Sequence, residues 1–488
     1  MSNKTLNPVS FGTSGHRGII NKTFTHDHVT AIAVGIASLF TAPHQTTLVI
    51  GFDPRQGNDI HYKPGSFTHT LIHSLNKLGI NTISFSDYIP TPIISWAINY
   101  FKVDGGIILT ASHNPPNYNG IKFNPKNGAP APENITKQIE AVANNYLENP
   151  DNLTCDTIGT HSQQQAPLKA FSEHLLKSCK TLGLPIPKTF SKPLQVDVKH
   201  GACGTLWQEL SKLLNLEINI KHYEPRSDFG NIEPNPTKYD QLDVAPPTYY
   251  ASTANDPDGD RHAVRDNQGN IVTPETLTAI IIDYLCKNAT KPTQLATTLA
   301  SSHILKTICN QHAINYHETA VGFKHFAPYF EQAKQHHETC IGIESSGGFS
   351  VSHHTFEKCG FLPIIILTII CELSTKSLAT LKEEVETNYG QYYFTETEFK
   401  FKETQKETLK NYLKTTSKES LENDFNITIK TINTSDGLKI ETQDSWALCR
   451  LSGTEPIARI YSESTHKTQS KWLNKKFHDV LTTKLKII

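Results

Sequence analysis

Apolar runs of two lengths alternate along the first 165 residues. Short runs such as TTLVIGFD (46–53) and DGGIILTAS (104–112) are typical of buried strands. Longer stretches such as VTAIAVGIASLF (29–40) and GSFTHTLIHSLNKLG (65–79) repeat their apolar residues at helical spacing. This alternation predicts a sheet of parallel strands with crossover helices, in a first α/β domain over 1–165.

The same rhythm starts twice more. After the polar stretch GTHSQQQAP (159–167), a helical pattern (168–179) precedes the strand-like LQVDVKHGACG (194–204), which predicts a second α/β domain over 166–275. A third domain is predicted over 276–385, ending in the apolar helix FLPIIILTIIC (361–371). Three units of similar length indicate a diverged repeat, although no strict period is visible.

The last hundred residues follow a different pattern. The charged stretch FKFKETQKETLKNYLKTTSKESLEN (399–423) predicts helix, and the strand-like runs FNITIKTI, GLKIET and SWALCRL follow in succession. Strands grouped in this way predict an α+β domain over 386–488. The segment RLSGTEP (450–456) would be a loop between two of these strands.

Composition narrows the class of partner. The chain of 488 residues carries 46 Lys and Arg against 47 Asp and Glu, so no overall field attracts nucleic acid or anionic lipid, and a small polar substrate is favoured. Nine cysteines without a C-x-x-C pair favour neither a disulfide framework nor a zinc site. The start of the chain lacks an apolar signal sequence. We therefore expect a cytoplasmic protein with no nucleic-acid or membrane partner.

Ser112 and His113 stand at the end of a predicted strand, directly before the chain-breaking NPPNYNG. A nucleophilic serine hydrolase usually carries its serine in a G-x-S-x-G turn, and here Ala111 and His113 flank the serine instead. Hydrolase chemistry is therefore disfavoured. A serine that only caps the turn is the plain alternative.

Three aspartates lie within five residues of the segment NDPDGDRH, at Asp256, Asp258 and Asp260. Carboxylates this close repel one another unless a cation binds them, and Mg²⁺ prefers oxygen ligands together with a phosphate. The spacing excludes an EF-hand, which needs glycine at the sixth position of its loop, where Arg261 stands here. A solvated turn is the alternative, because Asp-Pro-Asp-Gly also suits turns.

Two further loops are suited to hold anions. RLSGTEP offers Arg450, two hydroxyls and backbone amides, and GTSGHRG places Arg17 among three glycines. The latter is neither a Walker loop nor a dinucleotide fingerprint, so ATP and NAD are not implied. In GIESSGG, Glu344 and Ser346 offer an acceptor and a donor for sugar hydroxyls.

Taken in order, the motifs FGTSGHRG, TASHNPP, NDPDGDRH, VGFK, ESSGG and RLSGTEP resemble the α-D-phosphohexomutases, and among them the phosphoglucomutases. The resemblance implies four domains around a central cleft: three related mixed-sheet α/β domains and a C-terminal α+β domain. It implies a phosphorylated Ser112, with Mg²⁺ held by that phosphoserine and by Asp256, Asp258 and Asp260. The implied reaction interconverts α-glucose 1-phosphate and glucose 6-phosphate, with glucose 1,6-bisphosphate as intermediate and activator.

The same resemblance implies roles for the other site residues. Around the transferring phosphate it places Arg17, His113, Lys122 and Arg261. For the non-reacting phosphate and the sugar it implies Arg450, Ser452, Gly453, Thr454, Glu344, Ser346 and Lys324. In HHTFEKCG, His354 and Lys358 match a segment whose lysine contacts the bisphosphate or moves a proton, although His354 is explained equally well as a structural histidine.

The chain departs from the family pattern at three positions. Cys359 replaces an aspartate that could tune Lys358, while Ile343 replaces a glycine and Ser345 a glutamate beside the sugar contacts. A phosphomannomutase or a bifunctional phosphohexomutase therefore remains an alternative, and so does a catalytically silent scaffold protein. We expect a monomer or a weak homodimer that binds a hexose phosphate.

Overall fold

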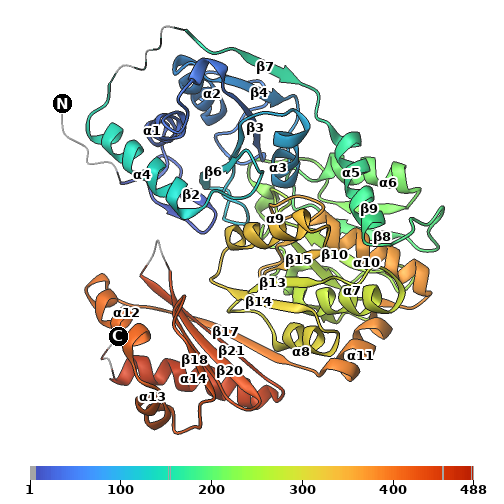
Figure 1. Cartoon of the computed structure of the whole chain (residues 1–488). Coiled ribbons are helices and arrows are strands. Elements are labelled where there is room, and N and C mark those ends of the chain that lie inside the picture. The colour runs from blue at the N-terminus through green and yellow to red at the C-terminus, as the bar shows by residue number, and fades with distance from the viewer. Residues whose placement is uncertain are drawn as a thin grey trace.

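The computed structural model describes residues 7–151, 153, 155, 157–452, 456–484 and 486. Four sheets follow one another along the chain, and we call the units built on them domains I to IV (Figure 1). Figure 1 shows domain I in blue at the upper left and domain IV in red at the lower left, with domains II and III beside them. The limits between the domains that the sequence suggested stay a prediction.

Domain I is built on a seven-stranded mixed sheet in the order β1-β2-β6-β5-β3-β4-β7. Its strands are β1 (Phe11–Gly12), β2 (Gly15–Ile19), β3 (Thr47–Phe52), β4 (Asn81–Phe85), β5 (Gly105–Leu109), β6 (Tyr118–Pro125) and β7 (His161–Gln164). Its helices are α1 (His26–Ala37), α2 (Phe67–Lys77), α3 (Thr91–Tyr100) and α4 (Glu133–Glu148), with the 3₁₀ turn η1 (Pro43–Gln45).

Domain II carries a five-stranded sheet in the order β12-β11-β10-β8-β9. Its strands are β8 (Leu194–Asp197), β9 (Ile218–Lys221), β10 (Ser252–Asn255), β11 (His262–Arg265) and β12 (Ile271–Val272). Its helices are α5 (Leu168–Thr181) and α6 (Gly204–Leu214), with the 3₁₀ turns η2 (Phe229–Asn231) and η3 (Tyr239–Gln241).

Domain III carries a four-stranded sheet in the order β14-β13-β15-β16. Its strands are β13 (Gln294–Thr298), β14 (Asn315–Thr319), β15 (Cys340–Ile343) and β16 (Phe349–Val351). Its helices are α7 (Pro274–Asn288), α8 (His303–Gln311), α9 (Ala327–Gln335), α10 (Phe361–Ser374) and α11 (Leu378–Tyr389), with the 3₁₀ turn η4 (Phe323–Phe326).

One four-strand arrangement recurs in the first three sheets. The orders β6-β5-β3-β4, β11-β10-β8-β9 and β16-β15-β13-β14 are equivalent: three parallel strands, and a last strand that is antiparallel to its neighbour. This confirms the predicted relation between the three α/β domains. The sheets are mixed rather than purely parallel, because the chain turns back directly after the third parallel strand of each repeat.

Domain IV has an entirely antiparallel sheet in the order β17-β21-β20-β19-β18. Its strands are β17 (Tyr393–Lys400), β18 (Thr431–Asn433), β19 (Leu438–Glu441), β20 (Ser445–Leu451) and β21 (Ile457–Ser464). Its helices are α12 (Lys406–Thr415), α13 (Lys418–Phe425) and α14 (Lys467–Lys484), with the 3₁₀ turn η5 (Glu403–Gln405). The predicted α+β domain is confirmed.

The domains share apolar packing. One continuous core joins buried residues of domains I, II and III and includes most of α10, with the ring of Phe361 tilted against that of Trp207 at a centroid distance of 5.2 Å. A second core lies within domain I. Domain IV has a core of its own and meets domain III through a smaller cluster in which Leu299 packs with Trp446 and Tyr461. Domains I to III are therefore held more extensively to one another than to domain IV.

The polar stretch before α5 forms an exposed edge strand, β7, which the sequence pattern did not predict; it pairs with β4 through its backbone and so needs no apolar residues. One local expectation is wrong: the charged stretch at 399–423 is not one helix. It begins in β17, and Ser417 interrupts it by accepting a hydrogen bond from the amide of Ser420 as the N-cap of α13.

In the described part of the chain, no single helix is long and apolar enough to cross a membrane. Helices α10 and α11 reach the required length only together, and the chain bends by 93° between them. The residues of α10 from Phe361 to Cys371 are buried inside the protein, which accounts for their apolar character.

We predict that Gly360→Ala destabilises the protein. Gly360 precedes α10, and a β-carbon there would lie 2.2 Å from the carbonyl oxygen of Arg261 and 2.5 Å from Nδ2 of Asn255. Relieving such contacts between packed domains costs about 1–3 kcal/mol. The thermal midpoint of the variant should fall by several degrees in calorimetry, and an unchanged midpoint would contradict the packing described here.

Candidate functional site

Three loops that carry predicted site residues occupy the same position in the repeat. Ser112 follows β5, the three aspartates follow β10, and Glu344 follows β15; each loop connects the third parallel strand to the antiparallel one. The loops are in contact. Ser112 Oγ donates to Asp256 Oδ2 at 2.7 Å, and Arg261 forms a β-bridge with Gly348. The repeat therefore brings Ser112, the three carboxylates and the loop of Glu344 to one junction of three domains.

Ser112 is fully buried and has an unusual backbone. Its φ is +52°, in the left-handed region, which costs a residue with a side chain about 1–2 kcal/mol. The amide of Ser112 donates to Thr110 Oγ1 at 2.8 Å, and Nδ1 of His113 lies 3.4 Å from Ser112 Oγ. The hydroxyl is thus aimed at Asp256 rather than at its own turn, which argues against a mere capping role.

Sequence reasoning missed Asp53 and Arg55, which follow β3 in the stretch GFDPR. Both are fully buried, and Arg55 Nε lies 2.9 Å from Asp53 Oδ2. Arg55 donates to the backbone carbonyl of Ser112, while Thr110 Oγ1 donates to Asp53 Oδ2 at 2.7 Å. An arginine directly after a buried strand was the available signal, because a charged residue is almost never fully buried unless it is paired.

Asp256, Asp258 and Asp260 form what we call the carboxylate cluster. All three are buried, and each offers a carboxylate oxygen within 4.8 Å of the others. Lys122 Nζ lies 2.6 Å from Asp258 Oδ2 and 2.7 Å from Asp260 Oδ2, and Thr91 Oγ1 donates to Asp258 Oδ2 at 2.8 Å. The cluster therefore belongs to domain II, while residues of domain I neutralise and orient it.

The cluster has the donor set of a divalent-cation site. Among the described residues, Oδ1 of Asp258 and Oδ1 of Asp260 are buried without a hydrogen-bond partner. Buried carboxylate oxygens without a partner are costly, and a hard cation with oxygen ligands satisfies them. The residues present thus fit Mg²⁺, with Ser112 Oγ next to Asp256 as a further oxygen.

The pKa values of the three carboxyl groups diverge. Burial, followed by repulsion from Asp258 and Asp260, raises the pKa of Asp256 well above its usual range. Burial by itself would also raise the pKa values of Asp258 and Asp260. Attraction to Lys122 outweighs this effect, so both pKa values lie below the usual range. A bound cation would favour the ionised form of Asp256 as well.

Two more cations face the cluster. Lys358 Nζ lies 3.3 Å from Asp260 Oδ2, and Arg261 Nε lies 3.8 Å from Asp260 Oδ1. Lys358 also pairs with Glu357 at 3.3 Å, so carboxylates accompany this lysine although Cys359 replaces the family aspartate. Burial by itself would lower the pKa of Lys358, but the negative charges of Asp260 and Glu357 outweigh burial and raise this pKa. Cys359 itself is buried in the apolar core.

Arg17 and His113 occupy the domain I side of this site. Arg17 Nη1 donates to Asn114 Oδ1 at 2.8 Å, in the same loop as Ser112. Burial and then repulsion from Arg261 lower the pKa of Arg17 to about 10, so it remains charged near neutral pH. Burial and the charges of Arg261 and Arg17 lower the pKa of His113 well below its usual value, so its imidazole is neutral.

Glu344 lies beside these cations. It is buried, and burial raises the pKa of its carboxyl group, while Lys358 and Arg261 partly oppose this rise. A β-carbon on Gly348 would lie 2.4 Å from Cδ of Lys358 and 3.3 Å from Oε2 of Glu344, so only glycine lets the two side chains lie together there. Ser346 lies in the same loop and is partly exposed.

Three predicted residues lie apart from these contacts. His354 packs against α5, stacked 5.0 Å from His174, with its Nδ1 3.0 Å from Ser178 Oγ, which agrees with a structural histidine. Lys324 lies on η4 and is partly exposed. Arg450 Nε donates to Asp436 Oδ2 at 2.8 Å at the end of β20 in domain IV.

The predicted phosphate loop follows β20. The amide of Ser452 donates to the carbonyl of Ile457 at 2.8 Å, while Gly453 and Thr454 lie outside the described residues. Asp436, the partner of Arg450, also accepts the amide of Val321 at 2.8 Å. This carboxylate therefore links the strand that carries Arg450 to the domain III segment that carries Lys324.

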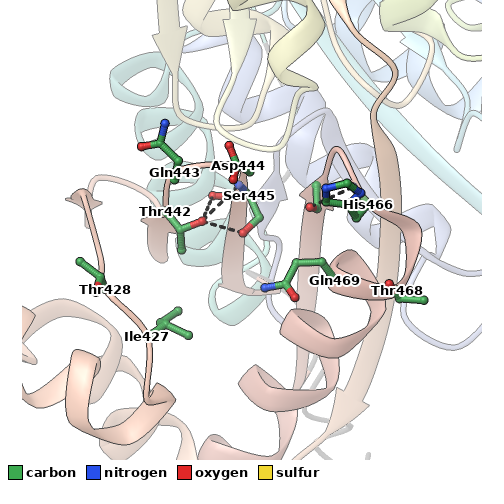
Figure 2. Close-up of a pocket in the computed structure, with 10 residues that line it drawn as sticks. Ile427, Thr428, Thr442, Gln443, Asp444, Ser445, His466, Thr468 and Gln469 are labelled. Carbon is green, nitrogen blue, oxygen red and sulfur yellow. Dashed lines mark hydrogen bonds between the residues drawn. The ribbon is translucent and has the colours of Figure 1, made fainter.

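A pocket of about 460 Å³ lies elsewhere, in domain IV (Figure 2). Figure 2 shows polar side chains such as Thr442, Ser445 and His466 around it. None of the predicted site residues that the structure describes lines it. We assign the chemistry to the junction of domains I to III, where the buried charges converge.

Comparison with known proteins identifies the family. Three models of the phosphoglucomutase/phosphomannomutase family match this chain. The model of the family's α/β/α domain I matches residues 8–150, that of α/β/α domain III matches residues 273–389, and that of the C-terminal domain matches residues 398–477. The chain belongs to this family. It is thus a member of the α-D-phosphohexomutase superfamily, which uses Mg²⁺, and an intramolecular phosphotransferase by class.

Its relatives carry different substrate names. The chain is 26% identical to a phosphoglucomutase/phosphomannomutase of Thermococcus kodakarensis, over 94% of this chain and 96% of the relative. It is 28% identical to a phosphoglucosamine mutase of Caldanaerobacter subterraneus subsp. tengcongensis, over 97% of this chain and 99% of the relative. A phosphoglucomutase/phosphomannomutase family protein of Burkholderia thailandensis shares the fold, with a TM-score of 0.76, 20% identity and coverage of 99% and 98%.

We predict that Mg²⁺ stabilises the wild-type mutase against unfolding and that Asp258→Asn abolishes this effect. A ligand present at a hundred times its Kd adds about 2.7 kcal/mol to the free energy of unfolding. The measurement is the thermal midpoint with and without Mg²⁺. Asp228→Asn is the matched control, because Asp228 pairs with Arg226 outside the carboxylate cluster and should leave the response intact. An equal Mg²⁺ response in Asp258→Asn would refute the metal assignment.

Proposed function

We propose that the protein is a phosphoglucomutase that interconverts α-D-glucose 1-phosphate and glucose 6-phosphate. The observation that carries the proposal is the 2.7 Å hydrogen bond from Ser112 Oγ to Asp256 Oδ2, which joins a buried hydroxyl to a cluster of carboxylates suited to a cation. The motifs FGTSGHRG and NDPDGDRH, which resemble those of glucose-specific members, support glucose as the sugar.

In this proposal Ser112 carries a phosphoryl group. The P–Oγ bond of phosphoserine breaks as a P–O6 bond forms on glucose 1-phosphate, and the proton of the O6 hydroxyl passes to a base in the site. The product, glucose 1,6-bisphosphate, turns over in the site. The P–O1 bond then breaks, the P–Oγ bond forms again and O1 takes up a proton, which leaves glucose 6-phosphate.

The charges around Ser112 suit this reaction. Phosphoryl transfer requires mainly positioning and neutralisation of negative charge. Arg17, Lys122 and Arg261 supply positive charge beside the cluster, and Mg²⁺ on Asp256, Asp258 and Asp260 would stabilise the charge on the transferring group. Lys358 shares a carboxylate with this cluster and lies next to Glu344.

The remaining predicted residues are proposed to hold the rest of the substrate. Glu344, Ser346 and Lys324 would contact the sugar in both orientations, since a pyranose offers similar hydroxyls after it turns over. The non-reacting phosphate would bind at Arg450, Ser452, Gly453 and Thr454. We further propose a monomer or weak homodimer whose partner is the hexose phosphate alone.

A mannose or dual specificity is the second candidate. The departures at Ile343 and Ser345, on either side of Glu344, and the relatives named for other substrates favour it. Values of kcat/KM for glucose, mannose and glucosamine 1-phosphates decide between them, since specificity is a ratio of such values. A highest value for glucose supports the first proposal, and a comparable value for mannose supports the second.

We predict that Ser112→Ala abolishes mutase turnover and the uptake of phosphate from glucose 1,6-bisphosphate, because no hydroxyl remains to carry the group. The matched control is Ser172→Ala, which removes another buried serine hydroxyl, one without a hydrogen-bond partner among the described residues. The control should keep turnover within about twofold, as expected for a distant site. Turnover of Ser112→Ala at the wild-type rate would refute the phosphoserine mechanism.

A further inference from the structure

Arg55 is a fully buried arginine whose guanidinium binds one carboxylate and two backbone carbonyls. Its Nε lies 2.9 Å from both oxygens of Asp53, and Nη1 donates to the carbonyl of Tyr118 at 2.9 Å. Its Nη2 donates to the carbonyl of Ser112. An arginine suits this place because its planar fork of donors holds several acceptors in fixed directions.

The two carbonyls bound by Arg55 stand at opposite ends of one loop. Ser112 lies near the end of β5, and Tyr118 is the first residue of β6. The guanidinium thus closes the base of the loop formed by residues 113–117. We call this set of contacts from Arg55 to Asp53 and to the two carbonyls the clamp. Because Arg55 itself follows β3, the neighbour of β5 in the sheet, the clamp is fixed to the core of domain I.

Both backbone polar groups of Ser112 depend on this pair. Its carbonyl accepts from Arg55, and its amide donates to Thr110 Oγ1, which in turn donates to Asp53 Oδ2 at 2.7 Å. These two contacts hold Ser112 at a φ of +52°, a conformation that a serine rarely adopts unless its surroundings require it. Relaxation to an ordinary φ would turn Oγ away from Asp256.

The clamp also reaches domain II. The guanidinium carbon of Arg55 lies 5.2 Å from the ring centroid of Phe229, which is buried in η2. A cation over an aromatic face at this distance is an attractive contact. Arg55 therefore lies between the loop that carries the nucleophile and the domain that carries the carboxylate cluster.

Comparison of domains I and II shows which part of the clamp occurs only beside Ser112. Domain II has a similar ion pair at the end of β8, the strand that corresponds to β3, with Lys199 Nζ 3.1 Å from Asp197 Oδ2. The loop after β10 carries carboxylates rather than a nucleophile. The ion pair recurs, but an arginine able to bind two carbonyls at once stands beside Ser112.

We propose that Arg55 is a positioning residue for phosphoryl transfer: with Asp53 and Thr110 it holds the Ser112 loop so that Oγ faces the carboxylate cluster. The proposal rests on the proposed function. It assigns Arg55 no contact with substrate. Loss of the clamp should therefore impair the chemical step and leave the binding of hexose phosphate largely intact.

The test is Arg55→Lys, which keeps the charge next to Asp53 but cannot bind both carbonyls. We expect kcat to fall by at least about 30-fold, since a misplacement of 1 Å can cost about 10²-fold, while KM changes by less than about threefold. The matched control is Arg265→Lys, another arginine that donates to a backbone carbonyl, that of Tyr239, at the far end of β11. The control should keep kcat within about twofold.

A folded Arg55→Lys enzyme with wild-type kcat, or with KM raised in place of a lowered kcat, would overturn the proposal. If this variant does not fold, Thr110→Val decides, because it removes the link from Asp53 to the amide of Ser112 without a change of shape. A reduced kcat with KM unchanged supports the clamp, and an unchanged kcat overturns it.

A crystal structure of the variant separates this proposal from the proposed function. If the wild type is inactive on every hexose phosphate, the proposed function fails, whatever the state of the loop. If Ser112 keeps its positive φ and its contact with Asp256 in the variant, the clamp fails, whatever the activity of the wild type. A Ser112 turned away from Asp256 in the variant supports the clamp in either case.

Discussion

The neutralisation of three buried carboxylates is the constraint on which the rest of this structure depends. Asp256, Asp258 and Asp260 come from one domain, whereas the lysines that pair with Asp258 and Asp260, Lys122 and Lys358, come from the two others, and Asp256 accepts a hydrogen bond from Ser112 of domain I. Buried charges without partners would be strongly destabilising, so domains I, II and III must meet at this point. The junction that stabilises the fold is therefore also the place where a phosphate and a cation can be bound.

The repeat explains how one junction acquires three different sets of polar side chains. In each of the first three domains the loop after the third parallel strand points to the same place, and only its residues differ: a serine, three aspartates, or Glu344 with Ser346. A change of function at this site needs substitutions in short loops, not a change of sheet. This agrees with a family whose members carry several substrate names at similar identity.

Much of the fold and of the site could be predicted from the sequence because their signals are local. The three aspartates, the strand that precedes Ser112 and the apolar helix α10 are each encoded within a few residues; the aspartates lie together, β5 ends three residues before Ser112, and α10 is a buried helix. Arg55 was missed because its role depends on carbonyls more than fifty residues away. The edge strand β7 was missed because backbone pairing leaves no apolar pattern.

The central claim is that Ser112 carries the phosphoryl group that this site exchanges with a hexose. The most direct measurement is to incubate the Mg²⁺-loaded enzyme with glucose 1,6-bisphosphate labelled with ³²P, digest it and locate the label by peptide sequencing. The account predicts the label on Ser112 and its loss when unlabelled glucose 1-phosphate is added. A label on another residue, or a label on Ser112 that glucose phosphates cannot remove, would contradict it.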